Sequence, residues 1–99
     1  MRLTTEIRLE KDYLYIRILG QFDLADAKAI LEDSLRSADK FNLTRILIDY
    51  REIGGRIPDI DRYEYGMHHA QLIQERIARG LPVVRAAYVG SYPLFDSSH

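Results

Sequence analysis

The sequence contains no cysteine. Disulfides, thiolate nucleophiles and cysteine-based zinc sites are therefore excluded, and a reducing compartment is the natural setting. No apolar run approaches the roughly 20 residues that a membrane-spanning helix needs. Residues 1–6 also lack the apolar core of a signal peptide. We therefore expect a cytoplasmic protein without a transmembrane segment.

The sequence also has no large excess of positive or of negative charge. The chain has 14 basic and 15 acidic residues, a formal net charge of -1. Nucleic-acid binders show a basic excess or stripe, and proteins that bind anionic membranes carry basic clusters. We therefore expect no nucleic-acid partner. The 99 residues are 46% hydrophobic, which predicts a single domain over residues 1–99 with one core.

The first third of the chain predicts a β-hairpin. Residues 4–9 alternate weakly between apolar and polar, and residues 13–19 alternate clearly. In the second run Leu14, Ile16 and Ile18 share one face, while Tyr13 and Tyr15 share the other. Period-two alternation is typical of strands, and the short polar segment 10–12 between the runs predicts an antiparallel turn.

A helix is predicted over residues 24–40. Asp23 is a suitable N-cap, and Asn42 is a suitable residue to end the helix. The predicted inner face consists of Leu24, Ala27, Ile30, Leu31, Leu35 and Ala38. This spacing of three and four residues is that of an amphipathic helix packed on a core.

A third strand is predicted over Arg45–Tyr50. Residues 46–48 are apolar without alternation, which predicts a strand covered on both faces. Residues 52–59 then predict a loop, because Gly54 and Gly55 permit unusual backbone angles and Pro58 bars a continuing helix.

A second helix and a fourth strand complete the prediction. Asp59 or Asp61 caps the helix, Gly80 ends it, and residues 81–89 form the strand. The predicted core stripe of this helix consists of Ile60, Tyr63, Met67, Ala70, Ile73 and Ile77. The order β-β-α-β-α-β, with parallel crossovers, predicts an α/β fold: a mixed sheet with helices packed on it in two or three layers.

In this order, four segments resemble the STAS superfamily and within it the SpoIIAA-like (STAS/SEC14-type) domains. They are residues 15–20, 45–50, 61–64 and 84–90, and the resemblance covers nearly the whole chain. It implies a mixed sheet with packed helices and a role in binding partner proteins. The best-known members are switched by phosphorylation of a serine that follows the strand-end aspartate. Residues 51–60 contain no serine or threonine, so we expect no phosphorylation site here.

The carboxyl ends of the parallel strands are the predicted site, because open α/β sheets bind ligands there. The candidate binding residues are Asp49, Arg51, Arg56, Asp59, Asp61, Arg62, Ser91 and Tyr92. An anion could bind the exposed amides at the start of the second helix, with Arg56 as a bidentate partner. The alternative is that these residues have a structural role and bind no ligand. In that case the Asp49 carboxylate caps amides of the loop, and Arg51 or Arg56 forms ion pairs with nearby acidic side chains.

Metal and enzyme chemistry have weaker support. His68 and His69 lie about 100° apart on a helix, so they cannot both hold one ion. Glu64 and His68 are four residues apart and could bind the same ion. A zinc site needs three or four ligands, however, so we expect no metal and no cofactor. A hydrolase or isomerase would need Asp49, one of the histidines and Ser91 to converge, and no nucleophile-elbow motif supports this.

Seven tyrosines are many for 99 residues. They either pack in the core or form a surface for a partner or for a homodimer. We therefore expect a non-enzymatic, regulatory binding module. It would contact an unidentified protein or small ligand at the edge near Asp49 and the start of the second helix. The small-molecule hydrolase and a SEC14-like lipid carrier remain the alternatives.

Overall fold

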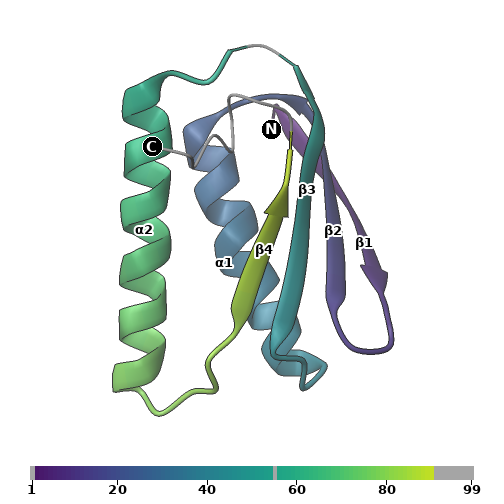
Figure 1. Ribbon diagram of the computed structural model, residues 1–99, viewed down its shortest axis with the longest axis vertical. Helices are drawn as coiled ribbons and strands as arrows, with labels where there is room; N and C mark the ends of the chain where they lie inside the picture. The colour runs from purple at the N-terminus through teal and green to yellow at the C-terminus, as the bar shows by residue number, and fades with distance from the viewer. Residues whose placement is uncertain (1, 55, 91–99) are drawn as a thin grey trace.

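The computed structural model describes residues 2–54 and 56–90, and they form an α/β domain with a four-stranded mixed sheet and two helices (Figure 1). In chain order the elements are β1 (Leu3–Leu9), β2 (Leu14–Gln21), α1 (Leu24–Lys40), β3 (Arg45–Gly54), α2 (Asp59–Ala78) and β4 (Arg85–Val89). The predicted element order is confirmed.

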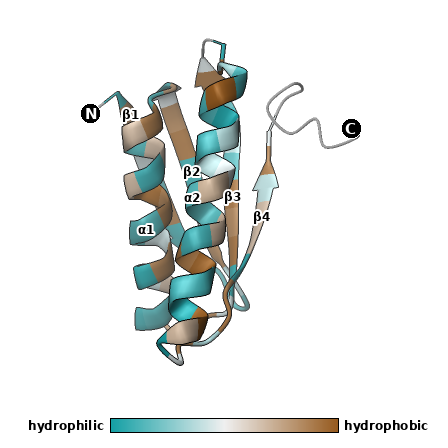
Figure 2. Ribbon diagram, turned by 90° about the vertical axis from the view of Figure 1, so that its left-hand side faces the viewer, coloured by the Kyte–Doolittle hydropathy of each residue, from teal (hydrophilic) through white to brown (hydrophobic). Residues whose placement is uncertain are grey.

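The strands lie in the order β1-β2-β3-β4. The hairpin β1–β2 is antiparallel, while β2–β3 and β3–β4 are parallel. Both crossovers advance in the same direction along the sheet, so crossovers of the same hand place both helices on the same face. Figure 2 shows α1 and α2 side by side on one side of the sheet. The molecule therefore has two layers.

The local signals for α1 are confirmed. The Asp23 side chain accepts a hydrogen bond from the Asp26 amide at 3.0 Å. At the other end Asn42 adopts a φ of 57°, and the Leu43 amide donates to the Ala38 carbonyl at 2.8 Å. This reversal satisfies carbonyl groups that the ending helix would otherwise leave unpaired.

The core lies between the helices and the sheet, as the alternation in β2 predicts. Leu14, Ile16 and Ile18 are buried completely, and Ile46 and Ile48 of β3 lie beside them. From the helical side the core receives Ala27, Ile30, Leu31, Leu35 and Ala38. We call the opposite surface of the sheet, on which no described helix lies, the outer face.

The prediction for β3 was wrong in two respects. Helices cover only one face of β3. The strand also extends into the first residues of the predicted loop, as far as Gly54. The extension is paired with β2, with Gly20 opposite Ile53 and Gln21 opposite Gly54. A polar sequence continues as a strand here because its backbone groups find partners in β2 and its side chains can face solvent.

The predicted core stripe of α2 was also wrong. Ile60, Tyr63, Met67 and Ile77 are 49–65% exposed, whereas Tyr65 and Leu72 pack against the core. The inner side of the helix carries aromatic and amphipathic side chains, which hydropathy alone ranks as poor core residues.

The ends of α2 agree with prediction at one end only. Pro58 takes the N-cap position without a side-chain hydrogen bond, and Asp59 and Asp61 lie within the first turn. At the other end Gly80 has a φ of 74°, and the Leu81 amide donates to the Arg76 carbonyl at 2.9 Å. The predicted C-terminal glycine is therefore confirmed.

The fourth strand is shorter than the predicted 81–89, because only Arg85–Val89 pairs with β3. Val84, just before it, is buried in the core. Neither of the two described helices is long and apolar enough to cross a membrane.

Candidate functional site

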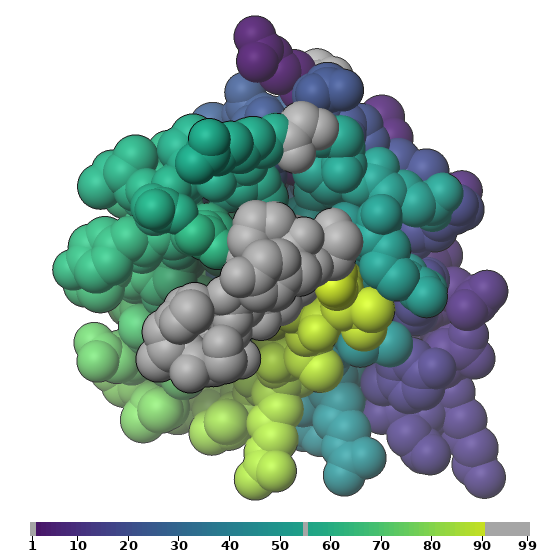
Figure 3. Space-filling view, turned by 45° about the horizontal axis from the view of Figure 1, so that its top comes forward, coloured from purple at the N-terminus to yellow at the C-terminus, as the bar shows by residue number. Residues whose placement is uncertain are grey.

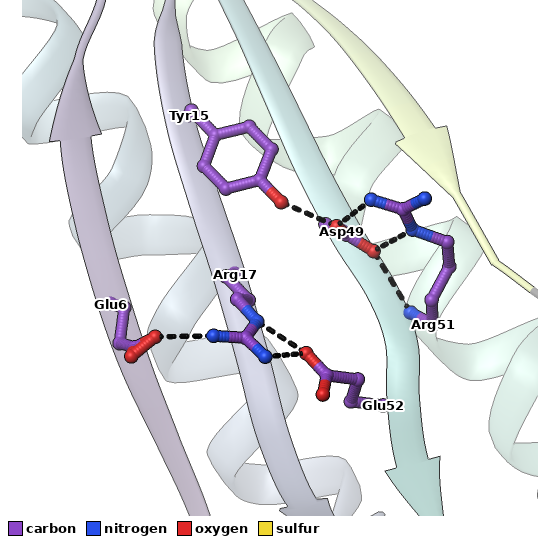
Figure 4. A network of polar contacts seen from close by, with 6 residues as sticks. All are labelled: Glu6, Tyr15, Arg17, Asp49, Arg51 and Glu52. Carbon is purple, nitrogen blue, oxygen red and sulfur yellow. Dashed lines mark hydrogen bonds and ion pairs between the residues drawn. The ribbon is translucent and has the colours of Figure 1, made fainter.

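A charged network covers the outer face of the sheet around Asp49 (Figure 4). Asp49 is only 3% exposed. The Tyr15 hydroxyl donates to its Oδ2 at 2.5 Å. Arg51 donates three hydrogen bonds to the same carboxylate, from its amide at 3.0 Å, Nε at 3.0 Å and a terminal nitrogen at 2.7 Å. The carboxylate therefore has a donor for most of its lone pairs.

Arg17 extends the network across three strands. Its guanidinium pairs with Glu6 of β1 at 2.7 Å and with Glu52 of β3. Arg8 lies over the Tyr15 ring, 4.7 Å from the ring centroid. These side chains border a shallow groove of about 670 Å³ on the outer face. The contacts hold the strands in register, and each charge already has an opposite charge or a ring beside it.

Electrostatics keep the Asp49 carboxyl group ionised at neutral pH. The Arg51 guanidinium holds the pKa of this carboxyl well below its usual range, and the Tyr15 hydroxyl adds to that effect against the opposing effect of burial. Asp49 in turn raises the pKa of Tyr15. A general base works best with a pKa near the operating pH, so Asp49 is too weak a base for that role at neutral pH.

Asp49 was expected at the end of its strand, beside the start of the second helix. It is instead the fifth of the ten residues of β3, and its side chain points away from both helices. Its neighbour Tyr50 points toward them, because successive side chains of a strand alternate between faces. Asp49 therefore organises the outer face of the sheet and has no contact with the start of α2.

We expect Asp49→Asn to lower the free energy of unfolding by about 1–2 kcal/mol at pH 7. Hydrogen bonds to charged groups contribute about 1.5–3 kcal/mol, discounted here because Arg51 is largely exposed. Since the folded pKa of Asp49 is depressed, its contribution is complete above about pH 4 and is lost as the pH falls. Urea unfolding from pH 7 to pH 2 should therefore show the two proteins converging in acid. A difference that stays constant to pH 2 would contradict this assignment.

A second site lies at the carboxyl ends of the parallel strands, on the helical side of the sheet. It is a pocket of about 220 Å³ with mostly apolar walls. The lining residues are Phe22, Tyr50, Ile57, Arg62, Tyr65, Gly66, His69 and Tyr88. We call it the tyrosine pocket. In Figure 3 this edge is turned forward, with the start of α2 in teal and the end of β4 in yellow.

The polar atoms of the tyrosine pocket form one hydrogen-bonded chain. The Tyr50 hydroxyl donates to that of Tyr65 at 3.3 Å, and the Tyr65 and Tyr88 hydroxyls lie 3.1 Å apart. The chain ends at Nδ1 of His69, 3.1 Å from the Tyr88 hydroxyl. The tyrosine rings pack edge-to-face or stacked, with centroids 6.0–6.4 Å apart. These contacts hold the rings of the pocket wall in fixed positions relative to one another.

Apart from Arg62, the described residues that line the tyrosine pocket are uncharged at neutral pH. Burial raises the pKa of Tyr50 to about 12 and raises the pKa values of Tyr65 and Tyr88 as well. Burial also lowers the pKa of His69, so its imidazole is neutral. Among the described lining residues, Arg62 is the one that carries a positive charge, and it pairs with Asp59.

The structure separates the predicted site residues into two groups. Asp49 and Arg51 are together on the outer face, and Asp59 and Arg62 are together in the first turn of α2, where Asp61 also lies. Arg56 is exposed in the loop before α2. The two remaining candidates, Ser91 and Tyr92, lie outside the described residues.

Of the eight lining residues, the sequence-based list of binding residues contains only Arg62. It omits the four residues of the hydrogen-bonded chain, Tyr50, Tyr65, His69 and Tyr88. A signal existed for three of them. Tyr50 has the same parity as the buried Ile46 and Ile48, so alternation directs it to the helical side. Tyr65 and His69 are four residues apart on α2 and therefore share a side, but the wrong helical stripe concealed this.

The histidines face different surroundings. Nε2 of His68 lies 3.4 Å from Glu32 of α1, whereas His69 faces Tyr88 of β4. Within residues 2–54 and 56–90, no group of three or more acidic or histidine side chains could hold a metal ion. Asp49 lies on the opposite face of the sheet from His69, so the described residues do not assemble the catalytic set that a hydrolase would need.

Comparison with known proteins adds no family assignment. No protein-family model matches the chain, and no curated protein is significantly similar to it in sequence.

Proposed function

We propose that this chain is a non-enzymatic binding module and that the tyrosine pocket receives a small ligand with a flat apolar body and a negatively charged group. The observation that supports it is the pocket itself: aromatic rings from two strands and one helix, preorganised by hydrogen bonds, with the guanidinium of Arg62 among the described lining groups. Ligand sites have this composition, apolar walls with a few convergent polar groups.

Size and charge restrict the ligand. A dry apolar cavity of roughly 150 Å³ holds benzene, so about 220 Å³ suits one or two fused rings. Arg62 pairs with Asp59, and its guanidinium can also donate to a carboxylate on that ring, whereas an ammonium offers it no acceptor. An enclosed lipid is disfavoured by size. The pocket volume of about 220 Å³ is below the roughly 300–1,000 Å³ of sites for drug-sized ligands, and a lipid is at least as large as such ligands. We propose aromatic carboxylates as the ligand class.

Gly66 gives independent support for a site at this position. A glycine inside a helix costs about 1 kcal/mol relative to alanine. Apart from its chain neighbours and the nearby backbone of its own helix, no described residue lies within 4 Å of the position that its Cβ would take. Crowding by the described residues therefore does not explain the glycine, whereas a side chain larger than a methyl group would project into the pocket that Gly66 lines.

Indole-3-carboxylate and benzoate test the proposal, with benzylamine as the charge-reversed control. In ¹H–¹⁵N spectra we expect the acids to shift the amide signals of Gly66 and His69, with dissociation constants of about 0.1–1 mM, and benzylamine to bind at least about fivefold more weakly. Gly66→Leu should abolish these shifts by filling the pocket. Gly66→Ala should keep most of the binding and raise the free energy of unfolding by about 1 kcal/mol.

The proposal fails if neither acid shifts these amides, or if Gly66→Leu binds as well as the unaltered protein. Shifts confined to Arg17 and Arg51 would instead move the site to the groove on the outer face.

We also propose that the domain is STAS-like, cytoplasmic and regulatory, with ligand occupancy altering the surface that a partner protein meets. The mixed sheet with both helices packed on it supports this, since the resemblance implies that architecture. A pull-down with and without indole-3-carboxylate tests it. A set of captured proteins that does not change with the ligand would contradict it.

A further inference from the structure

The outward side of α2 carries a line of residues that we call the α2 stripe. It consists of Ile60, Tyr63, Met67, Ala70, Gln74 and Ile77. The exposed fractions of its four large apolar side chains are 61% for Ile60, 65% for Tyr63, 49% for Met67 and 57% for Ile77. Figure 2 shows apolar residues spread along α2, which stands in front of the sheet. Single exposed apolar residues are normal, but a continuous line of them is typical of an interface.

The spacing of the stripe fits packing against an identical helix. Its members are separated by three and four residues in alternation, as at the core positions of a coiled coil. This spacing is the same when read from either end. A two-fold axis across antiparallel helices therefore places Ile60 against Ile77 of the second copy and Met67 against its Ala70. Large side chains then meet one another at the ends, and a large one meets a small one near the centre.

The polar members fit the same arrangement. Tyr63 lies against Gln74 of the second copy, so the phenolic hydroxyl can bond to the side-chain amide. Along the flank of the stripe, Glu64 comes near Gln71 of the second copy, where no like charges meet.

Charge favours the antiparallel orientation. Asp59, at the start of the helix, comes near the basic end marked by Arg79 of the second copy. In a parallel pair, Asp59 would instead face Glu64 of the second copy, and symmetry would repeat this repulsion. Antiparallel helix dipoles also attract one another.

We propose that two copies of this chain associate through the α2 stripe in an antiparallel, two-fold symmetric dimer. The stripe is about 26 Å long, and one helix pair of this length buries less than the roughly 1,200 Å² of stable complexes. The dimer is therefore weak, with a dissociation constant of about 10–500 µM. The proposed dimer does not depend on the ligand pocket. Tyr63 of α2 would be the tyrosine that contributes to the homodimer surface expected from the sequence.

Sedimentation equilibrium between about 10 and 500 µM tests the association. The average mass should rise with concentration for the unaltered protein. Met67→Glu and Ile77→Glu should each weaken association at least about tenfold while leaving the circular dichroism spectrum unchanged. Leu9→Glu makes the same kind of change at a 54% exposed residue of β1 and should leave association unaltered. A mass that stays monomeric over the whole series overturns the proposal.

The absence of native cysteine allows the orientation to be tested by disulfide trapping. Ile60→Cys and Ile77→Cys are mixed and oxidised with copper–phenanthroline. The mixture should form the cross-linked dimer, whereas each variant alone should not, since its thiols lie at opposite ends of the interface. If either variant alone cross-links as efficiently as the mixture, the antiparallel arrangement is wrong.

Discussion

Arg76→Ala should lower the free energy of unfolding by about 3 kcal/mol. Arg76 is the one buried residue of α2, with a side chain only 10% exposed. It donates two hydrogen bonds to Asp39 at the end of α1, at 2.7 and 2.8 Å, and a third to the Pro82 carbonyl at 2.9 Å. Removing one partner of a buried ion pair typically costs about 3–5 kcal/mol. Asp39 keeps some contact with water, so the lower end of that range applies.

Two further variants separate the ion pair from packing. Arg76→Met keeps the hydrocarbon stem and should recover part of the loss, because that stem fills space between the helices. Urea unfolding of Asp39→Ala, of Arg76→Ala and of the double variant gives the coupling free energy between the two side chains. We expect this coupling to exceed about 1 kcal/mol. Coupling near zero would show that Arg76 acts by packing alone.

Gly20→Ala should also cost about 2–3 kcal/mol. Gly20 has a φ of 119°, a region that residues with a Cβ rarely adopt. A Cβ at this position would also clash with the carbonyl oxygen of Arg2, the residue just before β1. Strained backbone costs about 1–3 kcal/mol per residue, and relief of the clash requires β1 to move away from β2. The measurement is the urea midpoint at constant m-value.

Gly66→Ala is the matched control for this substitution. It makes the same chemical change inside a helix, where none of the described residues crowds the new methyl group, and it should stabilise the protein. Equal effects of the two substitutions would contradict the strain that we assign to Gly20.

Local chemistry was predictable because it depends on neighbours in sequence. Asp23 caps a helix with its own side chain, and Asn42 and Gly80 end helices through their own backbone angles. The buried face of β2 follows from the alternation of Leu14, Ile16 and Ile18. The element order then follows from these pieces.

The candidate site was only partly predictable. The carboxyl edge of the parallel strands was the expected place, and Arg62 does line the pocket there. Arg51, which contacts Asp49, is two residues away in sequence, but Tyr15, which also donates to Asp49, is 34 residues away. Proximity in sequence carries no information about such a pair until the register of two parallel strands is known.

The two helices, the hairpin and the α/β class were predictable from the sequence, because capping, turns and periodicity act over a few residues. The length of β3, the side of α2 that meets the core and the positions of three tyrosines around one pocket depend on how the elements pack together. β3 lengthens because β2 supplies backbone partners as far as Gly54. α2 turns Tyr65 and Arg76 inward because rings and hydrocarbon stems bury well when their polar ends find partners such as Tyr88 and Asp39. That choice is made by contacts distant in sequence, and it leaves the more hydrophobic stripe facing outward.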